Sequence, residues 1–456
     1  MTRWGWLIAG FALVAPMAAQ AQATAWRERI YADVLRADHG GAMEQVPLYP
    51  YQRLGDPSTR VMHVSSAGAP GVVLAGSAQI GDGDEGSAPT TPYVAKLDAG
   101  DGHVLWSWQP DTNAPPPGRI WWSDIDADGA VFVAGSLQTD DQPGRSLLAK
   151  LDGATGAELW RVVGEPSTTS YMFAFDAKGS VVVTSSEPND AGQRVAKYSA
   201  SDGSPGWSHV MESGTDWSRD FRVAVRPDGE IFAAGSCFDA AGDVEVVRLG
   251  ADDGAEAWRY VSPNMMELEE AQNVVVLGDD VLVASRAGRV RLAGDDGSIM
   301  WQQSIDSADF RTFDVIADGA GRLYAAGSNH VDRTAVVRRY DPATGDSLWE
   351  AVLSVPGDIP LASTWLVSLA GDGSLLPAWF SNPVGAASVD AESGVVAWSR
   401  LLDPILDASM PVGIVQAPDG STFVGAYEWS QGASATWIVF KLVDIAADTL
   451  FENGFD

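Results

Sequence analysis

Short apolar runs alternate with glycine-rich turns along most of this chain, and residues 120–163 show the unit that repeats. Val131–Ala134 is apolar at consecutive positions, which is typical of a strand buried on both faces. Turns are indicated at Asp126–Gly129 and Asp152–Gly156, where glycine can adopt a positive φ. One unit therefore predicts four short strands joined by hairpins and no helix. The strands are expected at Ile120–Ile125, Val131–Ala134, Leu147–Leu151 and Leu159–Val163.

The second strand of this unit recurs eight times at long, similar intervals. A local pattern repeated at such a period predicts a repeat architecture and not a set of unrelated elements. The copies are Val72–Ala75, Val131–Ala134, Val181–Thr184, Ile231–Ala234, Val281–Ala284, Leu323–Ala326, Leu375–Ala378 and Thr422–Gly425.

A tryptophan in the fourth strand recurs seven times, each with a glycine four residues before it, at spacings of 43 to 54 residues. The tryptophan is expected to cover apolar area between neighbouring sheets, and its indole N–H needs a partner. We predict an all-β protein, an eight-bladed β-propeller of four-stranded antiparallel blades. The tryptophans are Trp106, Trp160, Trp207, Trp258, Trp301, Trp349 and Trp398, and the glycines are Gly102, Gly156, Gly203, Gly254, Gly297, Gly345 and Gly394.

An eighth tryptophan lies near the start of the chain. Ala25–Ile30, with Trp26, resembles Ala257–Val261, with Trp258. If this segment supplies the outer strand of the last blade, the two ends of the chain meet in one sheet and close the ring, which leaves only short protected edges. The alternative is that Trp26 is a chance aromatic residue in a disordered leader.

The first 21 residues read as a signal peptide, with Arg3, an apolar run from Trp4 to Met17, and cleavage after about Ala21. No cysteine follows directly, so the protein is expected to be secreted or periplasmic and not a lipoprotein. Cys237 is the single cysteine, which excludes an intramolecular disulfide. We expect one propeller domain over residues 22–446, with residues 35–58 as a linker or extra loop and 447–456 as a C-terminal tail.

The formal net charge is −32. This charge argues against nucleic acid and anionic membrane surfaces as partners, because both need clustered positive charge. No other long apolar stretch follows the signal segment, so no membrane insertion is expected. We expect a monomer.

The segment Leu151–Trp160, with sequence LDGATGAELW, resembles the pyrroloquinoline-quinone-type (quinoprotein-like) propeller repeat, and Tyr340–Trp349 resembles it equally. The resemblance extends unevenly over residues 60–442 and implies an eight-bladed propeller. That family includes quinone-dependent alcohol dehydrogenases and non-enzymatic scaffolds of outer-membrane protein assembly. The adjacent cysteine pair of the enzymes is absent, so the scaffold branch is favoured. The tail Leu450–Asp456 is similar to short tails of secreted Gram-negative proteins.

Few residues point to catalysis or to a cofactor. Asp124–Gly129 begins like a calcium loop, but Gly135 stands where the bidentate glutamate would be needed, so a hairpin turn is the better interpretation. The five histidines His39, His63, His103, His209 and His330 show no metal-ligand spacing. We therefore predict no catalytic, cofactor-binding or metal residues, although a quinone or calcium remains a possible but unsupported cofactor.

Large side chains gather in the loops that enter the first, central strand of each unit. In a propeller these positions ring one mouth of the central channel, and variable loops are where function tends to lie. We predict that this mouth binds a protein, peptide or glycan and that the protein is a binding or assembly scaffold. The alternatives are that these side chains only fill space between blades, or that the protein is a quinone-dependent or polysaccharide-acting enzyme. The predicted contact residues are Trp121, Trp122, Tyr171, Trp217, Arg219, Phe310, Arg311 and Trp365.

Overall fold

The computed structural model describes residues 22–35, 43–49, 62–79, 90–111, 116–138, 144–188, 192–211, 222–237, 243–262, 271–285, 288–304, 310–329, 334–353, 363–381, 383–402, 408–430 and 433–444. These residues form strands and turns and contain no α-helix. Within these ranges, no helix is long and apolar enough to span a membrane. The predicted signal peptide and C-terminal tail lie outside the described residues.

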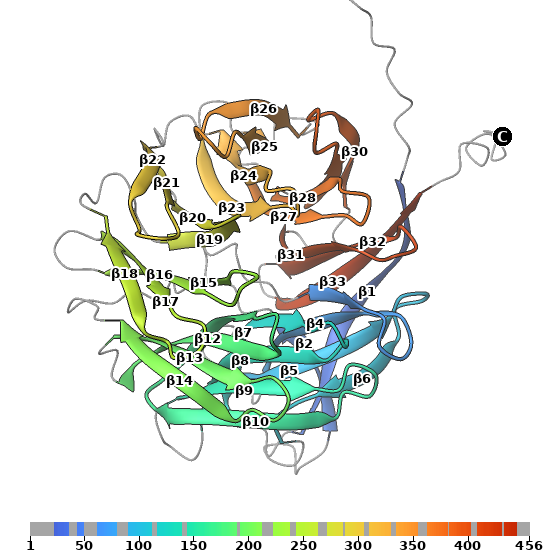
Figure 1. The fold of residues 1–456 in the computed structure, drawn as a ribbon. Helices are drawn as coiled ribbons and strands as arrows, with labels where there is room; N and C mark the ends of the chain where they lie inside the picture. The colour runs from blue at the N-terminus through green and yellow to red at the C-terminus, as the bar shows by residue number, and fades with distance from the viewer. Residues whose placement is uncertain are drawn as a thin grey trace, which may run out of the picture.

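Eight antiparallel four-stranded units follow one another around a ring, as Figure 1 shows, which confirms the predicted propeller. The first four are β3 (Met62–Ser65), β4 (Gly71–Gln79), β5 (Thr90–Asp98), β6 (Val104–Trp108); β7 (Gly118–Ile125), β8 (Val131–Leu137), β9 (Arg145–Leu151), β10 (Glu158–Pro166); β11 (Ser170–Phe175), β12 (Ser180–Ser186), β13 (Gln193–Ser199), β14 (Pro205–Met211); and β15 (Arg222–Val225), β16 (Ile231–Cys237), β17 (Asp243–Leu249), β18 (Glu256–Val261).

The remaining four units continue around the ring. They are β19 (Ala271–Leu277), β20 (Asp280–Ser285), β21 (Gly288–Leu292), β22 (Ile299–Ser304); β23 (Arg311–Ala317), β24 (Leu323–Asn329), β25 (Thr334–Tyr340), β26 (Ser347–Val352); β27 (Ser363–Leu369), β28 (Leu375–Phe380), β29 (Gly385–Val389), β30 (Val396–Leu401); and β31 (Ala408–Gln416), β32 (Thr422–Ser430), β33 (Ala433–Asp444), β1 (Gln22–Leu35).

The core lies between neighbouring sheets because the second and third strands are apolar on both faces. Val131, Phe132, Val133 and Ala134 of β8 are all fully buried. A strand sandwiched between two sheets has no solvent face, which explains the continuous apolar runs in the sequence.

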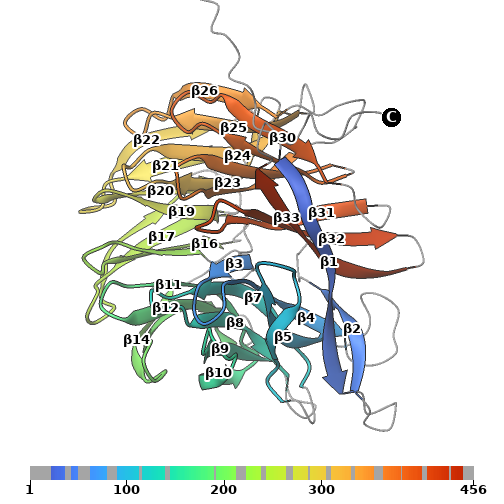
Figure 2. The same ribbon diagram turned by 90° about the vertical axis from the view of Figure 1, so that its right-hand side faces the viewer.

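The N-terminal strand β1 lies beside the C-terminal strand β33, as Figures 1 and 2 both show. Gln22 to Ile30 pair antiparallel with Asp444 to Trp437, and Trp26 stands opposite Lys441. The second half of β1 pairs with β2 (Met43–Tyr49), which also pairs with β4. Part of the segment 35–58, predicted as a linker or loop, is therefore a strand. Whether β1 holds the ring closed stays a prediction.

In six sheets, the glycine in the turn between the third and fourth strands packs against the tryptophan of the preceding sheet. A Cβ atom at Gly156 would lie 2.6 Å from the Trp106 ring, and one at Gly203 would lie 2.8 Å from the Trp160 ring. Only a residue without a side chain fits there, and φ is also positive at these turns. The same contact joins Gly254 to Trp207, Gly297 to Trp258, Gly345 to Trp301 and Gly394 to Trp349.

The indole N–H groups and a cation on the third strand donate to one shared backbone carbonyl in the turn of the next sheet. We call this arrangement the inter-sheet clasp. Five clasps have both donors: Trp106 (3.2 Å) and Lys96 (3.2 Å) on Gly153 O, Trp160 (3.2 Å) and Lys150 (3.1 Å) on Ala200 O, Trp207 (3.3 Å) and Lys197 (2.8 Å) on Ala251 O, Trp258 (2.7 Å) and Arg248 (3.0 Å) on Gly294 O, and Trp301 (2.9 Å) and Arg291 (2.6 Å) on Pro342 O.

The clasp also reaches from the last sheet to the first, because Lys441 Nζ donates to Ala99 O at 2.7 Å. The seventh sheet differs: Ser388 occupies the position of the cation. The third and fourth strands of the last sheet, β33 and β1, come from opposite ends of the chain, so no turn joins them. The seventh sheet therefore has no turn carbonyl to which a cation could donate.

Candidate functional site

The inner strands of all eight sheets surround a cavity of about 670 Å³ on the ring axis. A second cavity of about 640 Å³ lies toward the short turns and is lined by parts of β3, β7, β27 and β31 and by the Asp126–Gly129 turn. His63, Asp124, Ser368, Leu369 and Val415 line both. The two volumes are in the range of small-molecule pockets.

Two clusters of polar side chains, one around His63 and one around Asp314, interrupt the mainly apolar lining. His63 Nε2 lies 3.0 Å from Ser123 Oγ, and His63 Nδ1 lies 3.7 Å from Asp124 Oδ1. Across the axis, Asp314 accepts hydrogen bonds from Asn273 Nδ2 at 2.9 Å and from the Val367 N–H at 3.0 Å.

The order of Ser123, His63 and Asp124 is that of a hydrolase triad. Ser123 is, however, fully buried and lines neither cavity. A nucleophile must reach its substrate, so this arrangement positions the His63 ring and does not present a catalytic serine.

The described lining lacks the cationic side chains that a pyrroloquinoline quinone cofactor would need. Pyrroloquinoline quinone carries three carboxylates and needs cationic partners. Among the described lining residues there is no lysine or arginine, while Asp124 and Asp314 are acidic. A negatively charged lining in an acidic protein repels a polyanion.

The structure brings two of the predicted mouth residues together. Trp121 on β7 and Tyr171 on β11 belong to neighbouring sheets, are half-buried, and have ring centroids 5.7 Å apart. Arg311 is half-buried, with its guanidinium 5.5 Å from the centre of the Phe313 ring. Trp365 lies on β27, but its side chain is not described, and Trp217 and Arg219 lie outside the described residues.

Two other predicted mouth residues are buried between sheets. Trp122 is 6% exposed and packs with Phe132 and Phe173, and Phe310 is 1% exposed beneath the Arg338 guanidinium at 4.3 Å. Phe310 therefore fills space between blades, whereas Trp122 packs in the core and also lines the axial cavity. Two consecutive aromatic residues on a strand point to opposite faces, and the sequence alone does not say which face is covered.

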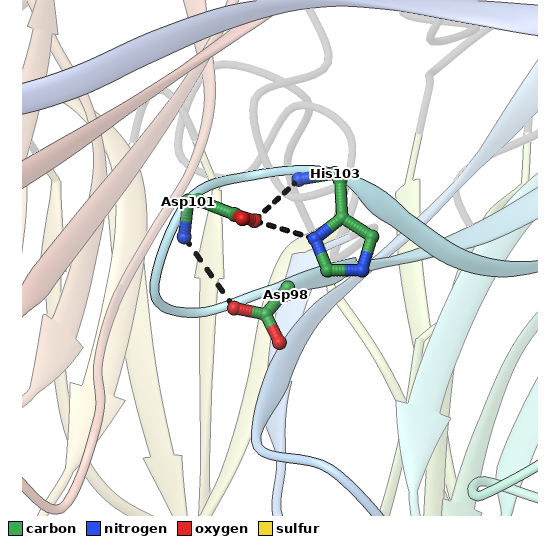
Figure 3. A group of neighbouring side chains, drawn as sticks. All are labelled: Asp98, Asp101 and His103. Atoms are coloured by element: carbon green, nitrogen blue, oxygen red, sulfur yellow. Dashed lines mark hydrogen bonds and ion pairs between the residues drawn. The ribbon is translucent and has the colours of Figure 1, made fainter.

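A group of possible metal ligands that the sequence analysis missed lies in the turn between β5 and β6. Ligand atoms of Asp98, Asp101 and His103 lie within 4.8 Å of one another, as Figure 3 shows. His103 Nδ1 is 2.5 Å from Asp101 Oδ1, and this hydrogen bond raises the pKa of His103 and lowers that of Asp101. The only sequence signal was the close spacing of the three residues.

These ligand atoms are already used by the turn itself. Asp98 Oδ1 accepts the backbone N–H of Gly100 at 2.7 Å, and Asp152 and Asp390 accept N–H groups at the same place in their own turns. The arrangement is therefore the turn chemistry of the repeat. The calcium-like segment behaves similarly, since Asp126 Oδ1 accepts the N–H groups of Asp128 and Ala130 while Asp126 Oδ2 pairs with Lys150 at 3.1 Å.

Fold and repeat together define the class: this is an eight-bladed propeller whose sheets are joined by Gly–Trp turn contacts. Residues 144–335 match the family model described as outer membrane protein assembly factor BamB. Over these residues the chain is similar to proteins with pyrroloquinoline-quinone-type β-propeller repeats. No protein of curated function matches by sequence.

Solved structures of similar fold share little sequence. BamB from Moraxella catarrhalis is 13% identical, with 96% of this chain and 99% of that chain covered and a TM-score of 0.48. A europium-containing methanol dehydrogenase is 11% identical, covering 92% and 93%, with a TM-score of 0.53. A quinohaemoprotein alcohol dehydrogenase from Pseudomonas putida HK5 is 13% identical, covering 87% and 78%, with a TM-score of 0.51. At this identity the likeness shows the fold and not the activity.

Proposed function

We propose that this protein is an exported binding or assembly scaffold, either periplasmic or secreted. It holds a protein or peptide partner at the channel mouth where the chain enters the inner strand of each sheet. The family model that matches residues 144–335 describes an assembly factor, which supports a protein partner over a glycan. Without an activity of its own, such a scaffold acts by presenting a fixed surface.

The observation that carries this proposal is the aromatic pair Trp121 and Tyr171. The two rings come from the inner strands β7 and β11 of neighbouring sheets, each in the first half of its strand, and both stay half-buried. Aromatic side chains held rigidly at a mouth supply large contact area at low entropic cost, and they are enriched in interface centres.

The quinone-dependent alternative is not favoured by the axial cavity. Its described lining carries Asp124 and Asp314 and no lysine or arginine to hold a polyanionic cofactor. The dehydrogenase structures share the fold, and the fold accommodates both enzymes and scaffolds.

The test is a double variant, Trp121→Ala with Tyr171→Ala, in a pull-down from cell-envelope extract followed by calorimetry with the purified partner. We expect partner affinity to fall at least tenfold, about 1.4 kcal/mol or more. Protease treatment of the captured material separates a protein from a glycan partner. The melting temperature should fall only slightly, because neither ring is fully buried.

Leu348→Ala is the matched control, since Leu348 is 53% exposed on the outer strand β26, away from the inner strands. It should leave partner binding unchanged. Equal partner affinity of the double variant and the wild type would overturn the assignment of this face. Unfolding of the double variant would show that the two rings are core residues and not contact residues.

A further inference from the structure

Arg289 is a buried cation between the fifth and sixth sheets. It lies on β21, in register with Ala284 and Gln303, and only 5% of its surface is exposed. Its guanidinium carbon is 3.7 Å from the centre of the Tyr340 ring, which reaches it from β25 of the next sheet.

The hydrogen bonds of this guanidinium are incomplete. Nη2 donates to Gln303 Oε1 at 3.0 Å, whereas Nε and Nη1 are buried with no acceptor in the part of the chain that the structure describes. Tyr340 itself is 2% exposed, and among the described residues its buried hydroxyl also has no hydrogen-bond partner. Polar groups that are buried this deeply are normally satisfied, so each exception needs an explanation.

No carboxylate of the described chain compensates the charge of Arg289. Other interface arginines do have one: Arg248 pairs with Glu230 at 2.9 Å, and Arg291, two residues further along β21, pairs with Asp280 at 2.5 Å. Around Arg289 the interface is apolar, with Leu282, Ala284 and Val336 buried in the same cluster as Tyr340.

An uncompensated charge in such a place is expensive. Most buried ionisable groups become neutral, but arginine keeps its proton and therefore stays charged. Water could accept the free N–H groups but would leave the positive charge unbalanced. The missing component is therefore an acceptor that also carries negative charge.

We propose that Arg289 and the Tyr340 hydroxyl form a binding site for a small anion, a halide or a simple carboxylate, between the fifth and sixth sheets. The guanidinium supplies the charge and N–H donors, and the phenol supplies an O–H donor. The bound anion completes the contact between two neighbouring blades, so its occupancy sets how firmly they are joined.

The test measures melting temperature against anion concentration at constant ionic strength, with a bulky sulfonate buffer salt as reference. Chloride and acetate are the two probes, and the stronger response identifies a halide or a carboxylate site. The wild type should gain several degrees and saturate, because a ligand that binds only the folded state stabilises it by mass action.

Arg289→Met removes the charge and keeps the length of the side chain. We expect its melting temperature to be independent of both anions and, in the reference salt, higher than that of the wild type. Arg248→Met is the matched control: it breaks a paired arginine, should melt lower in every salt, and should keep the anion response. In crystals grown with bromide, an anomalous peak beside the Arg289 guanidinium is expected.

Two results would overturn the proposal. One is a wild type whose melting temperature follows the reference salt in both anions, with no bromide peak at Arg289. The other is an equal anion response in wild type and Arg289→Met, which would place the bound ion elsewhere. The wild-type measurements decide the question even if Arg289→Met does not fold.

Discussion

At the scale of the residue, the third-strand cations have a role that their sequence position did not reveal. The recurring Ala–Lys–Leu pattern marks a strand, but it does not say where the ammonium group goes. Lys197 connects two sheets, because it pairs with Asp176 Oδ2 at 2.7 Å in its own sheet and donates to Ala251 O in the next. The carbonyl that accepts the hydrogen bond of the lysine lies in a turn some fifty residues away, and local sequence patterns cannot show this.

Lys197→Met should lower the free energy of unfolding by about 3–5 kcal/mol, because it leaves the fully buried Asp176 carboxylate without its partner. Urea denaturation at pH 7 measures the loss. Adding Asp176→Asn to Lys197→Met should restore much of it. A double variant as unstable as Lys197→Met would show that the inter-sheet hydrogen bond, and not the ion pair, dominates.

Stability should also depend on the protonation of Asp176. Burial alone would raise the pKa of this carboxyl, but the bond to Lys197 and the N–H groups of Ser180 and Lys178 outweigh burial and lower the pKa below its ordinary value of 3.8. The stabilisation is therefore present above about pH 4 and is lost as pH falls through the lowered pKa. Urea denaturation from pH 6 to pH 3 should show a smaller acid loss for Asp176→Asn than for the wild type.

At the scale of the element, the strands and turns were predictable because their signals are local. Buried strands read as continuous apolar runs, and the turns carry glycine at fixed places. The sequence indicated that Gly203 closes the turn between the third and fourth strands, but not that it also lies against Trp160 of the preceding sheet. Strand β2 was missed because Met43–Tyr49 has no counterpart in the repeat.

Gly203→Ala should therefore cost more than Gly179→Ala. Both glycines have a positive φ, of 72° and 80°, so both variants carry backbone strain of roughly 1–2 kcal/mol. At Gly179 a new Cβ meets nothing within 4 Å, whereas at Gly203 it would lie 2.8 Å from the Trp160 ring. We expect about 1–3 kcal/mol of additional loss at Gly203. If urea unfolding gave the same loss of unfolding free energy for both variants, Gly203 would have no packing role against Trp160.

At the level of the element, the sequence could not predict which aromatic residues of the inner strands are exposed. Trp121 and Trp122 are adjacent in sequence, but Trp121 is half-buried and Trp122 is buried in the core. That these aromatic residues form a binding mouth stays a prediction. The sequence could not separate exposed from packed side chains, because that depends on the neighbouring blade.

At the scale of the whole molecule, the repeat count indicated that the chain is one strand short at its C-terminal end. The pairing of β1 with β33 supplies a fourth strand to the last sheet. The absence of a cation at Ser388 follows from the same arrangement, because no turn exists there to accept its hydrogen bond.

Removing residues 22–35 should lower the melting temperature and promote aggregation, because it leaves the long strand β33 with an unpaired edge. A synthetic peptide of residues 22–35 added in trans should recover part of the lost stability. Melting of the shortened protein at the wild-type temperature would show that β1 does not close the ring.

A disulfide gives an independent check of the same pairing. Ala23→Cys with Val443→Cys, in a Cys237→Ser background, joins two residues that face each other across β1 and β33. We expect the bond to form and to raise the melting temperature by several degrees, since it stabilises by about 2–4 kcal/mol when geometry permits. Mass spectrometry under non-reducing conditions detects it.

The pairing of β1 with β33 also imposes an order of events on biosynthesis. Residues 22–30 of β1 have their partners on β33, more than 400 residues later along the chain. Seven sheets can form from neighbouring segments as the chain emerges, while the eighth is complete only after β33 has been made. Until then residues 22–30 of β1 lack their partner strand, while residues 31–35 can already pair with β2.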